Sequence, residues 1–287
     1  MAAIVLYHTG SPLPEHLFDC VAMIRRQSQD IPIHLITDQA DAAKEVRLLD
    51  VHLYHSVHRR FRDLERLQNL DYWSDGKATN NLWRSSCFRL WYIQRIMEEK
   101  GLKNVLTFDN DVLLFTKPEE IIERASQLYR DFAITAHNEA EVVFGMSFIP
   151  DWKCLADLTN WIEWRFKQGW ESLKREFHGF PNEMRLISAY PDYSCLPILP
   201  YGANRYARDC HHFQGVFDPS SYGQFLGGTA NGDGPGWFGV HQEIGQLISI
   251  GEIKVVFEDK KPWLIYAGER IPIFNLHVHS KRMEQFL

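Results

Sequence analysis

Residues 88–115 read FRLWYIQRIMEEKGLKNVLTFDNDVLLF, and this stretch decides the fold. Apolar side chains occur almost all round the helix that we predict over residues 82–100, which is typical of a buried helix. Gly101 ends this helix, and an apolar strand over residues 104–115 follows it. Two carboxylates, Asp109 and Asp111, interrupt the strand. Helix, glycine, strand and acid pair thus come in close succession, in the order of an α/β protein.

Strands and helices alternate on the N-terminal side of this stretch. The patterns predict strands over residues 3–10, 31–38 and 51–56 and a helix over residues 15–27. Strands separated by helical segments indicate a mostly parallel sheet covered by helices on both faces. Ligands of such sheets collect at the carboxyl ends of the strands. The turns after Tyr7 and after Thr37 and Asp38 are therefore expected to face a common crevice.

The C-terminal half is less regular. Helical signals cover residues 152–170, glycine-rich loops follow over 201–237, and strands are expected over 253–259, 264–266 and 273–281. No repeat, low-complexity tract or composition break marks a linker. We therefore predict one domain over residues 1–287, with a regular N-terminal half over residues 1–115 and an elaborated C-terminal half over residues 116–287.

Composition limits the possible functions. The 287 residues are 45% hydrophobic and carry a net charge of -6, which suits a folded core and provides no electrostatic footprint for nucleic acid. A basic cluster, Arg59, Arg60 and Arg62, lies among acids and is interpreted as a solvated helix face. Five irregularly spaced cysteines suit free thiols in a reducing compartment, and no stretch is apolar enough to cross a bilayer. We expect a cytoplasmic protein, with peripheral contact to a membrane left open.

The acid pair is the first candidate site. Side chains two apart in a strand point to the same side, so Asp109 and Asp111 are expected to converge while Asn110 faces away. Two carboxylates close together in apolar surroundings repel each other unless a cation or a proton offsets the charge. The alternative is that they cap the strand and bind helix N-termini or an arginine. We predict a metal site here.

A second candidate site closes the chain in the motif HVHSK. His277, His279 and Lys281 alternate along the predicted strand and would share one side of it. The alternative is a polar strand end at the surface. All three are residue types that can ligate a metal or bind a phosphate.

With these motifs the chain resembles the GT-A glycosyltransferases. In that family a D-x-D triplet follows such a strand and coordinates manganese or magnesium, which bridges the phosphates of a nucleotide-sugar donor. The resemblance covers residues 1–150 by element order and the closing residues by motif, and residues 88–115 are its most specific segment. It implies a Rossmann-like GT-A fold in which residues 1–115 bind the nucleotide-sugar. Residues 116–287 would serve the acceptor and close the site.

Enzymes resembling glycogenin and its bacterial galactosyltransferase relatives bring a C-terminal histidine to the metal and a lysine to the diphosphate. The segment here, H-x-H-S-K, departs from their H-x-x-G-x-x-K-P-W pattern. The resemblance implies that His277 or His279 is a metal ligand and that Lys281 offsets charge on the leaving diphosphate. The sequence does not choose between the two histidines. We expect these ties to ligands to order the C-terminal tail.

Donor-binding candidates come from the helix and from the strand ends. Arg89 lies near the middle of the predicted buried helix, where an unpaired guanidinium would be costly. Its partner is either an acid of the protein or, as in glycogenin-like transferases, the donor sugar, and Arg84 is a second candidate for that contact. The remaining donor-binding candidates lie at strand ends and in the acid triplet: Tyr7, Thr9, Asp38 and Asn110. Asp38 is favoured for the base or ribose.

Two C-terminal motifs contain candidates for the catalytic base. FDPSSYGQFLGGT, residues 217–229, combines an acid, hydroxyls, an amide and paired glycines, which suits either sugar binding or surface turns. GWFGVHQE, residues 236–243, resembles the G-W-x-x-E-D-type segment of inverting galactosyltransferases, in which an acid deprotonates the acceptor hydroxyl. The resemblance points to Glu243 as that base, and Asp218 and Asp192 are the alternatives.

The predicted function is transfer of a sugar from a nucleotide diphosphate donor to a hydroxyl of a glycan or other acceptor. The resemblance favours a UDP-sugar, because metal-dependent GT-A enzymes often use one. A sugar-phosphate nucleotidyltransferase is one rival, although the turn after the first strand, YHTGSPLPEH, lacks its glycine- and arginine-rich phosphate loop. A metallophosphoesterase with an H-x-H motif is disfavoured because the D-x-H ligands usual near its N-terminus are missing. A carbohydrate-binding module is suggested by nine tryptophans, but the first half lacks a β-sandwich pattern.

Overall fold

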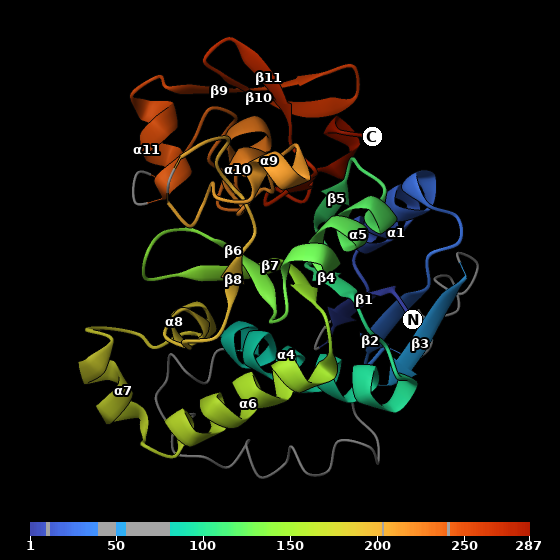
Figure 1. The fold of residues 1–287 in the computed structure, drawn as a ribbon, viewed down its shortest axis with the longest axis vertical. Coiled ribbons are helices and arrows are strands. Elements are labelled where there is room, and N and C mark those ends of the chain that lie inside the picture. Colours follow the sequence, from blue (N-terminus) through green and yellow to red (C-terminus); the bar gives the residue numbers. More distant parts are fainter. Residues whose placement is uncertain (10–11, 40–49, 56–80, 203, 240–241) are drawn as a thin grey trace.

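The computed structural model describes residues 1–9, 12–39, 50–55, 81–202, 204–239 and 242–287. Their main sheet has the strand order β3-β2-β1-β4-β7-β6-β8 (Figure 1). Its strands are β1 (Ala3–His8), β2 (Ile33–Thr37), β3 (Val51–His55), β4 (Val105–Phe108), β6 (Ala133–Ala136), β7 (Val142–Ile149) and β8 (Ser194–Cys195). Neighbours run parallel, except that β7 is antiparallel to β4 and β6. The predicted mostly parallel sheet is confirmed.

Some predicted features lie outside the described residues. These are Gly10 and Ser56 at the predicted strand ends, the basic cluster Arg59, Arg60 and Arg62, and residues 240–241 of the GWFGVHQE motif.

Helices cover both faces of the sheet, as Figure 1 shows. α1 (Glu15–Gln27) and α5 (Pro118–Leu128) pack into one buried apolar cluster, and α4 (Asn81–Lys100) and α6 (Trp152–Phe166) pack into another. α1 has the one-sided pattern of a surface helix, because Leu17, Val21 and Ile24 fall on the same face and are all fully buried. The helices predicted over residues 15–27 and 82–100 are confirmed.

The C-terminal half contains short helices. They are α7 (Trp170–Glu176), α8 (Glu183–Ser188), α9 (Cys210–Phe213), α10 (Tyr222–Gly227), α11 (Glu243–Ser249) and the 3-10 helix η3 (Met283–Gln285). The helical region predicted over residues 152–170 splits into α6 and α7. Gly169 lies between them with a φ of 82°, a left-handed conformation that interrupts the helix and favours glycine.

The predicted single strand over residues 104–115 is wrong at its centre. β4 ends at Phe108, and β5 (Val112–Leu114) pairs with β12 (Asn275–His277) in a separate two-stranded antiparallel sheet. Between β4 and β5 the chain turns, and the Val112 N–H donates to the Asp109 carbonyl at 3.1 Å. This turn, and not strand alternation, brings the two acids together. It places them at the carboxyl end of β4.

The closing segment belongs to the folded core. β9 (Ile253–Glu258), β10 (Lys261–Tyr266) and β11 (Glu269–Pro272) form an antiparallel sheet, and β12 follows. The strand predicted through residue 281 ends at His277. Beyond it, the Val278 N–H donates to the Asp111 carbonyl at 2.8 Å, and Val278, Met283 and Phe286 are buried. Ligands were expected to order the tail, but apolar packing already holds it in place.

All five cysteines are free thiols, and four of them are buried. No helix among the residues that the structure describes is long and apolar enough to span a bilayer.

Candidate active site

A cleft of about 1030 Å³ opens at the carboxyl ends of the parallel strands. Tyr7 and Thr9 reach it from the end of β1, and Asp38 from the end of β2. α4 contributes Arg84 and Arg89 to the wall, and the β4–β5 turn and the C-terminal tail contribute the candidate metal ligands. The turns that were expected to face one crevice do line this single cleft, as the general rule for parallel sheets predicts.

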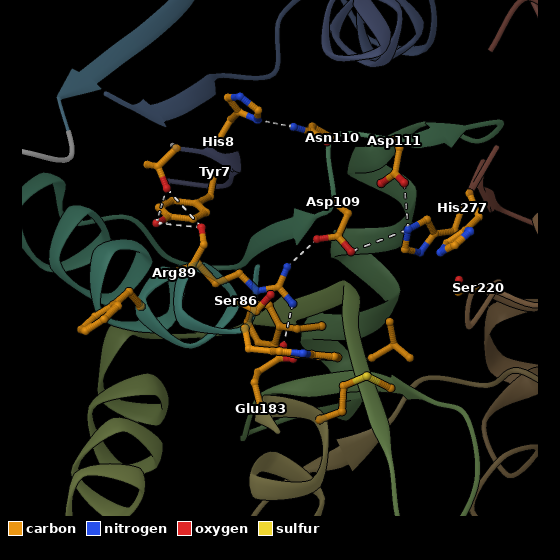
Figure 2. Close-up of a pocket in the computed structure, with 18 of the residues that line it drawn as sticks. Tyr7, His8, Ser86, Arg89, Asp109, Asn110, Asp111, Glu183, Ser220 and His277 are labelled. Atoms are coloured by element: carbon orange, nitrogen blue, oxygen red, sulfur yellow. Dashed lines mark hydrogen bonds and ion pairs between the residues drawn. The ribbon is translucent and has the colours of Figure 1, made fainter. Parts of the chain in front are cut away.

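Asp109, Asp111 and His277 converge in the cleft, as Figure 2 shows. One potential ligand atom of each lies within 4.8 Å of the others. The His277 Nε2 atom is 3.2 Å from Asp111 Oδ2 and 3.7 Å from Asp109 Oδ2. Two carboxylates and an imidazole form a donor set that fits manganese and other divalent first-row metals. These three residues could hold a metal ion.

The charges of this group influence one another. Burial is the largest influence on Asp111 and acts to raise its pKa, but the cations of His277 and Lys281 outweigh it, so the pKa lies below its usual range. Burial acts to lower the pKa of His277, but the carboxylates of Asp111 and Asp109 outweigh it and the pKa lies above its usual value. Asp111 therefore stays ionised. The raised pKa favours the cation of His277, whereas a histidine ligates a metal only as the neutral imidazole.

Arg89 connects Asp109 to a third carboxylate, that of the buried Glu183. Its Nη1 donates to Asp109 Oδ1, its Nη2 donates to Glu183 Oε1 at 2.7 Å, and its guanidinium lies 5.0 Å from the centre of the Phe144 ring. Arg89 thus has acids of the protein as partners, which was one of its two predicted alternatives. Because Asp109 gives Oδ1 to Arg89, its Oδ2 is left facing His277. Figure 2 shows this chain of ion pairs.

The structure distinguishes the two histidines. The backbone leaves the strand after His277, and the His279 N–H donates to the His277 carbonyl at 2.9 Å. His279 Nδ1 accepts the Ala230 N–H at 3.3 Å, and His279 lies outside the group that could hold a metal. Lys281 turns back to the acid pair and places its ammonium on the carboxylate of Asp111. The expected alternation of three side chains on one strand face does not occur.

One end of the cleft is aromatic and polar. The rings of Tyr7 and Tyr92 stack with centres 5.5 Å apart, and the Thr9 hydroxyl donates to the Tyr7 hydroxyl at 2.8 Å. Burial raises the pKa of Tyr92 to about 12, so this phenol is neutral and can donate a hydrogen bond. Asn110 faces away from the acid pair, as expected, and its amide lies 2.8 Å from His8 Nδ1.

The three predicted catalytic acids are absent from the described residues that line the cleft. Asp192 is exposed in the turn before β8, and Glu243 begins α11. Asp218 is buried, and its two oxygens accept the backbone N–H groups of residues 221, 222, 223 and 277 at 2.7–2.9 Å. Asp218 is therefore a structural anchor, and the geometry does not support a catalytic role for these acids.

Sequence reasoning missed other groups in the cleft. Two of these are the carboxylates of Glu183, which is 2% exposed, and Glu141. Three uncharged polar side chains, Ser220, Gln224 and Gln242, are also buried there. The hydroxyls and amide of residues 217–229 had already suggested sugar binding. For Glu183 the sequence offered only a helix start, since Asn182 caps α8 by accepting the Arg185 N–H, and nothing that indicated a place in the cleft.

No family model matches the chain, and no curated protein is similar to it. Among solved structures, mouse xyloside xylosyltransferase 1 in its apo form is 11% identical over 69% of this chain and 86% of its own, with a TM-score of 0.50. The glycosyltransferase GlyE of Streptococcus pneumoniae TIGR4 is 13% identical over 77% of this chain and 47% of its own, with a TM-score of 0.42. CMP:2-keto-3-deoxy-manno-octonic acid synthetase, complexed with CTP, is 10% identical with a TM-score of 0.37 and covers 73% of this chain and 95% of its own.

At these identities the likeness concerns the fold. The mixed α/β architecture, with its mostly parallel seven-stranded sheet flanked by helices, matches that of the GT-A nucleotide-diphospho-sugar glycosyltransferases. An Asp-x-Asp pair beside His277 accompanies this fold here and could hold a metal.

Proposed function

We propose that this chain is a metal-dependent glycosyltransferase. It moves a sugar from a nucleotide diphosphate-sugar to a hydroxyl of a glycan or other acceptor. The observation that carries the proposal is the convergence of Asp109, Asp111 and His277 at the carboxyl end of β4, inside a cleft of this fold. The donor we favour is a UDP-sugar, since metal-dependent GT-A enzymes often use one.

The metal would be held by the two carboxylates and by the imidazole of His277. The imidazole favours manganese over magnesium. A bound divalent ion supplies positive charge that stabilises the departing diphosphate. Lys281, whose ammonium already lies at Asp111, is placed to add a second positive charge at the diphosphate. His279 also lines the cleft, but its Nδ1 already accepts the Ala230 N–H.

The nucleoside would lie at the aromatic end of the cleft. Tyr7 and Tyr92 form a stacked pair there, and Asp38 lines the same cleft at the end of β2. The sugar would then lie near the metal group, where Glu183 and Gln224, which also line the cleft, could contact its hydroxyls. Arg84 also lines the cleft and is available to a donor phosphate or sugar.

The test is an assay of donor turnover. Purified protein is incubated with Mn²⁺ and each of several UDP-, GDP-, CMP- and dTDP-sugars, and release of the free nucleotide is measured with and without simple sugar acceptors. We expect release from one donor class, dependent on Mn²⁺ and abolished in Asp111→Asn. In a parallel reaction the protein receives nucleoside triphosphates and sugar phosphates. Release of pyrophosphate there, with no donor turnover, would identify a nucleotidyltransferase and overturn the proposal.

A further inference from the structure

Two cationic side chains meet at one oxygen of Asp111. The Lys281 Nζ contacts Asp111 Oδ2, and the His277 Nε2 lies 3.2 Å from the same oxygen. Asp111 is 2% exposed, whereas the side chain of Lys281 is 42% exposed. Lys281 therefore approaches a buried carboxylate from the open side of the cleft.

This contact puts Lys281 in competition with a metal ion. A buried carboxylate needs a positive partner, and Lys281 supplies one. A divalent ion ligated by Asp111 Oδ2 would lie within a few ångströms of the ammonium, and like charges at that distance repel strongly in a partly buried site. The ammonium therefore has to move away from Asp111 Oδ2 before an ion can bind there without this repulsion.

The local structure lets the side chain move while the backbone stays. The Lys281 N–H donates to the Val278 carbonyl at 2.8 Å, and Met283 and Phe286, which follow it, are buried. The Phe286 ring also packs edge-on against Phe257, with ring centres 5.1 Å apart. The lysine stem is long and flexible, so its ammonium can leave Asp111 without disturbing this anchor.

We propose that Lys281 has two alternative partners, the Asp111 carboxylate before metal binds and the donor diphosphate afterwards. This proposal rests on the proposed function. Its consequence is that Lys281 acts in opposite directions on two binding steps. It weakens the binding of a divalent ion alone, because it must first leave Asp111. It strengthens the binding of a nucleoside diphosphate once the ion is present.

The experiment compares the full chain with Lys281→Met, in which a similar stem lacks the charge. Mn²⁺ is titrated into EDTA-stripped protein by calorimetry, and UDP is then titrated at saturating Mn²⁺. We expect Lys281→Met to bind Mn²⁺ alone about fivefold more tightly, and to bind UDP about fivefold or more weakly. Arg282→Met removes the adjacent exposed cation and should change both constants little, which controls for net charge. Lys281→Arg retains the charge and should stay close to wild type in both titrations.

The outcomes separate this proposal from the function on which it rests. If wild type binds Mn²⁺ and Lys281→Met binds it with equal or lower affinity, the competition is wrong while the metal site stands. If Mn²⁺ binds to the variant but not to wild type, the competition is strongly supported. If neither binds Mn²⁺, both the metal site and the competition are overturned. If UDP binding is unchanged in the variant, Lys281 has no diphosphate partner and the second half of the proposal is wrong.

Discussion

The two oxygens of the Asp109 carboxylate have different partners. Arg89 takes Oδ1, and Oδ2 faces His277 at 3.7 Å. A guanidinium can hold Asp109 and Glu183 at the same time because its donors form a planar fork, which an ammonium cannot replace. Arg89 therefore orients a candidate metal ligand from outside the metal group.

We predict that Arg89→Lys lowers Mn²⁺ affinity by about 10- to 100-fold, the usual effect of losing a group that orients a ligand. The measurement is a Mn²⁺ titration of folded protein, with circular dichroism to verify the fold. Glu183→Gln keeps the shape and removes the balancing charge, so it should lower the affinity less. Wild-type affinity in Arg89→Lys would show that Asp109 needs no orienting partner.

Substitution of Asp111 should affect both metal binding and stability. Asp111→Asn keeps the size of the side chain but removes the charge that faces His277 and Lys281. We predict loss of measurable Mn²⁺ binding and donor turnover, together with a decrease of about 1–3 kcal/mol in the free energy of unfolding. Urea unfolding and the Mn²⁺ titration measure the two effects separately. Asp192→Asn, at an exposed position, is the control for both.

The pH dependence follows from the shifted pKa values of this pair. The pKa of Asp111 is lowered, so its contribution to stability is present above pH 3.8 and is lost as the pH falls towards the folded-state value. The pKa of His277 is raised, so its contribution is complete below pH 6.5 and is lost as the pH rises through the folded-state value.

We therefore predict two opposite trends as the pH rises from about 6.5, the ordinary pKa of histidine, through the raised pKa of His277. The melting temperature of EDTA-stripped protein should fall, and the affinity for Mn²⁺ should rise, because binding displaces the proton of His277. Thermal denaturation and Mn²⁺ titrations at several pH values test this. His277→Asn should flatten the melting trend, and a Mn²⁺ affinity that decreases with pH would contradict the role of His277.

At the scale of elements, Asp218 joins α10 to β12. Its carboxylate accepts three N–H groups at the start of α10 and the His277 N–H of β12, so one side chain fixes a candidate metal ligand against a helix. The two elements are in close contact at Gly223, where an added Cβ would lie 2.1 Å from the His277 carbonyl oxygen. The position of His277 therefore depends on this junction.

We predict that Asp218→Asn lowers the free energy of unfolding by about 2–4 kcal/mol, because an amide offers one acceptor oxygen where the carboxylate offers two. Chemical denaturation measures the loss. Glu243→Gln, in the half-exposed first turn of α11, should stay within about 0.5 kcal/mol of wild type. If Asp218→Asn unfolds at the wild-type midpoint, Asp218 is not the anchor described here.

Local sequence patterns predicted the regular elements well. Residues 15–27 and 82–100 have helical periodicity, and each forms the expected helix. The break between β4 and β5 escaped prediction because apolar residues continue on both sides of it, and hydrophobicity alone does not distinguish one buried strand from two. The turn after His277 escaped for a similar reason, since the alternating polar side chains of HVHSK continue the strand pattern.

The site was only partly predictable. Asp109 and Asp111 are close in sequence, so their convergence was expected even though the local geometry differs. The partner of Arg89 was left open, because Glu183 is 94 residues away and no local pattern reports that contact. For Asp218, the sequence shows an acid among glycines and hydroxyls, which fits a base as well as an anchor. The backbone N–H groups that donate to Asp218 in the structure indicate an anchor, and the sequence does not show them.

At the scale of the whole molecule, the cleft brings together segments from both ends of the chain. Tyr7 and Thr9 come from the first strand and His277 and Lys281 from the last residues, and α4 and the β4–β5 turn lie between them in sequence. A ligand that contacts all of these segments binds only the folded chain. Its binding should therefore stabilise the whole fold against heat.

We predict that a matching nucleoside diphosphate raises the melting temperature by about 5–11 °C when Mn²⁺ is present and the nucleotide is at about 100 times its Kd. Binding at that concentration contributes roughly 2.7 kcal/mol, and each kcal/mol shifts the melting temperature by about 2–4 °C in a chain of this size. UDP, GDP, CDP and dTDP are compared with Mn²⁺ and with EDTA, and the same series is run on Asp111→Asn. We expect one base, UDP in our proposal, to produce the shift, and only in wild type with Mn²⁺. An equal shift in EDTA or in Asp111→Asn would place the nucleotide away from the acid pair. Equal shifts for all four bases would mean that the cleft recognises the diphosphate alone, and that the aromatic end with Tyr7 and Tyr92 does not select the base.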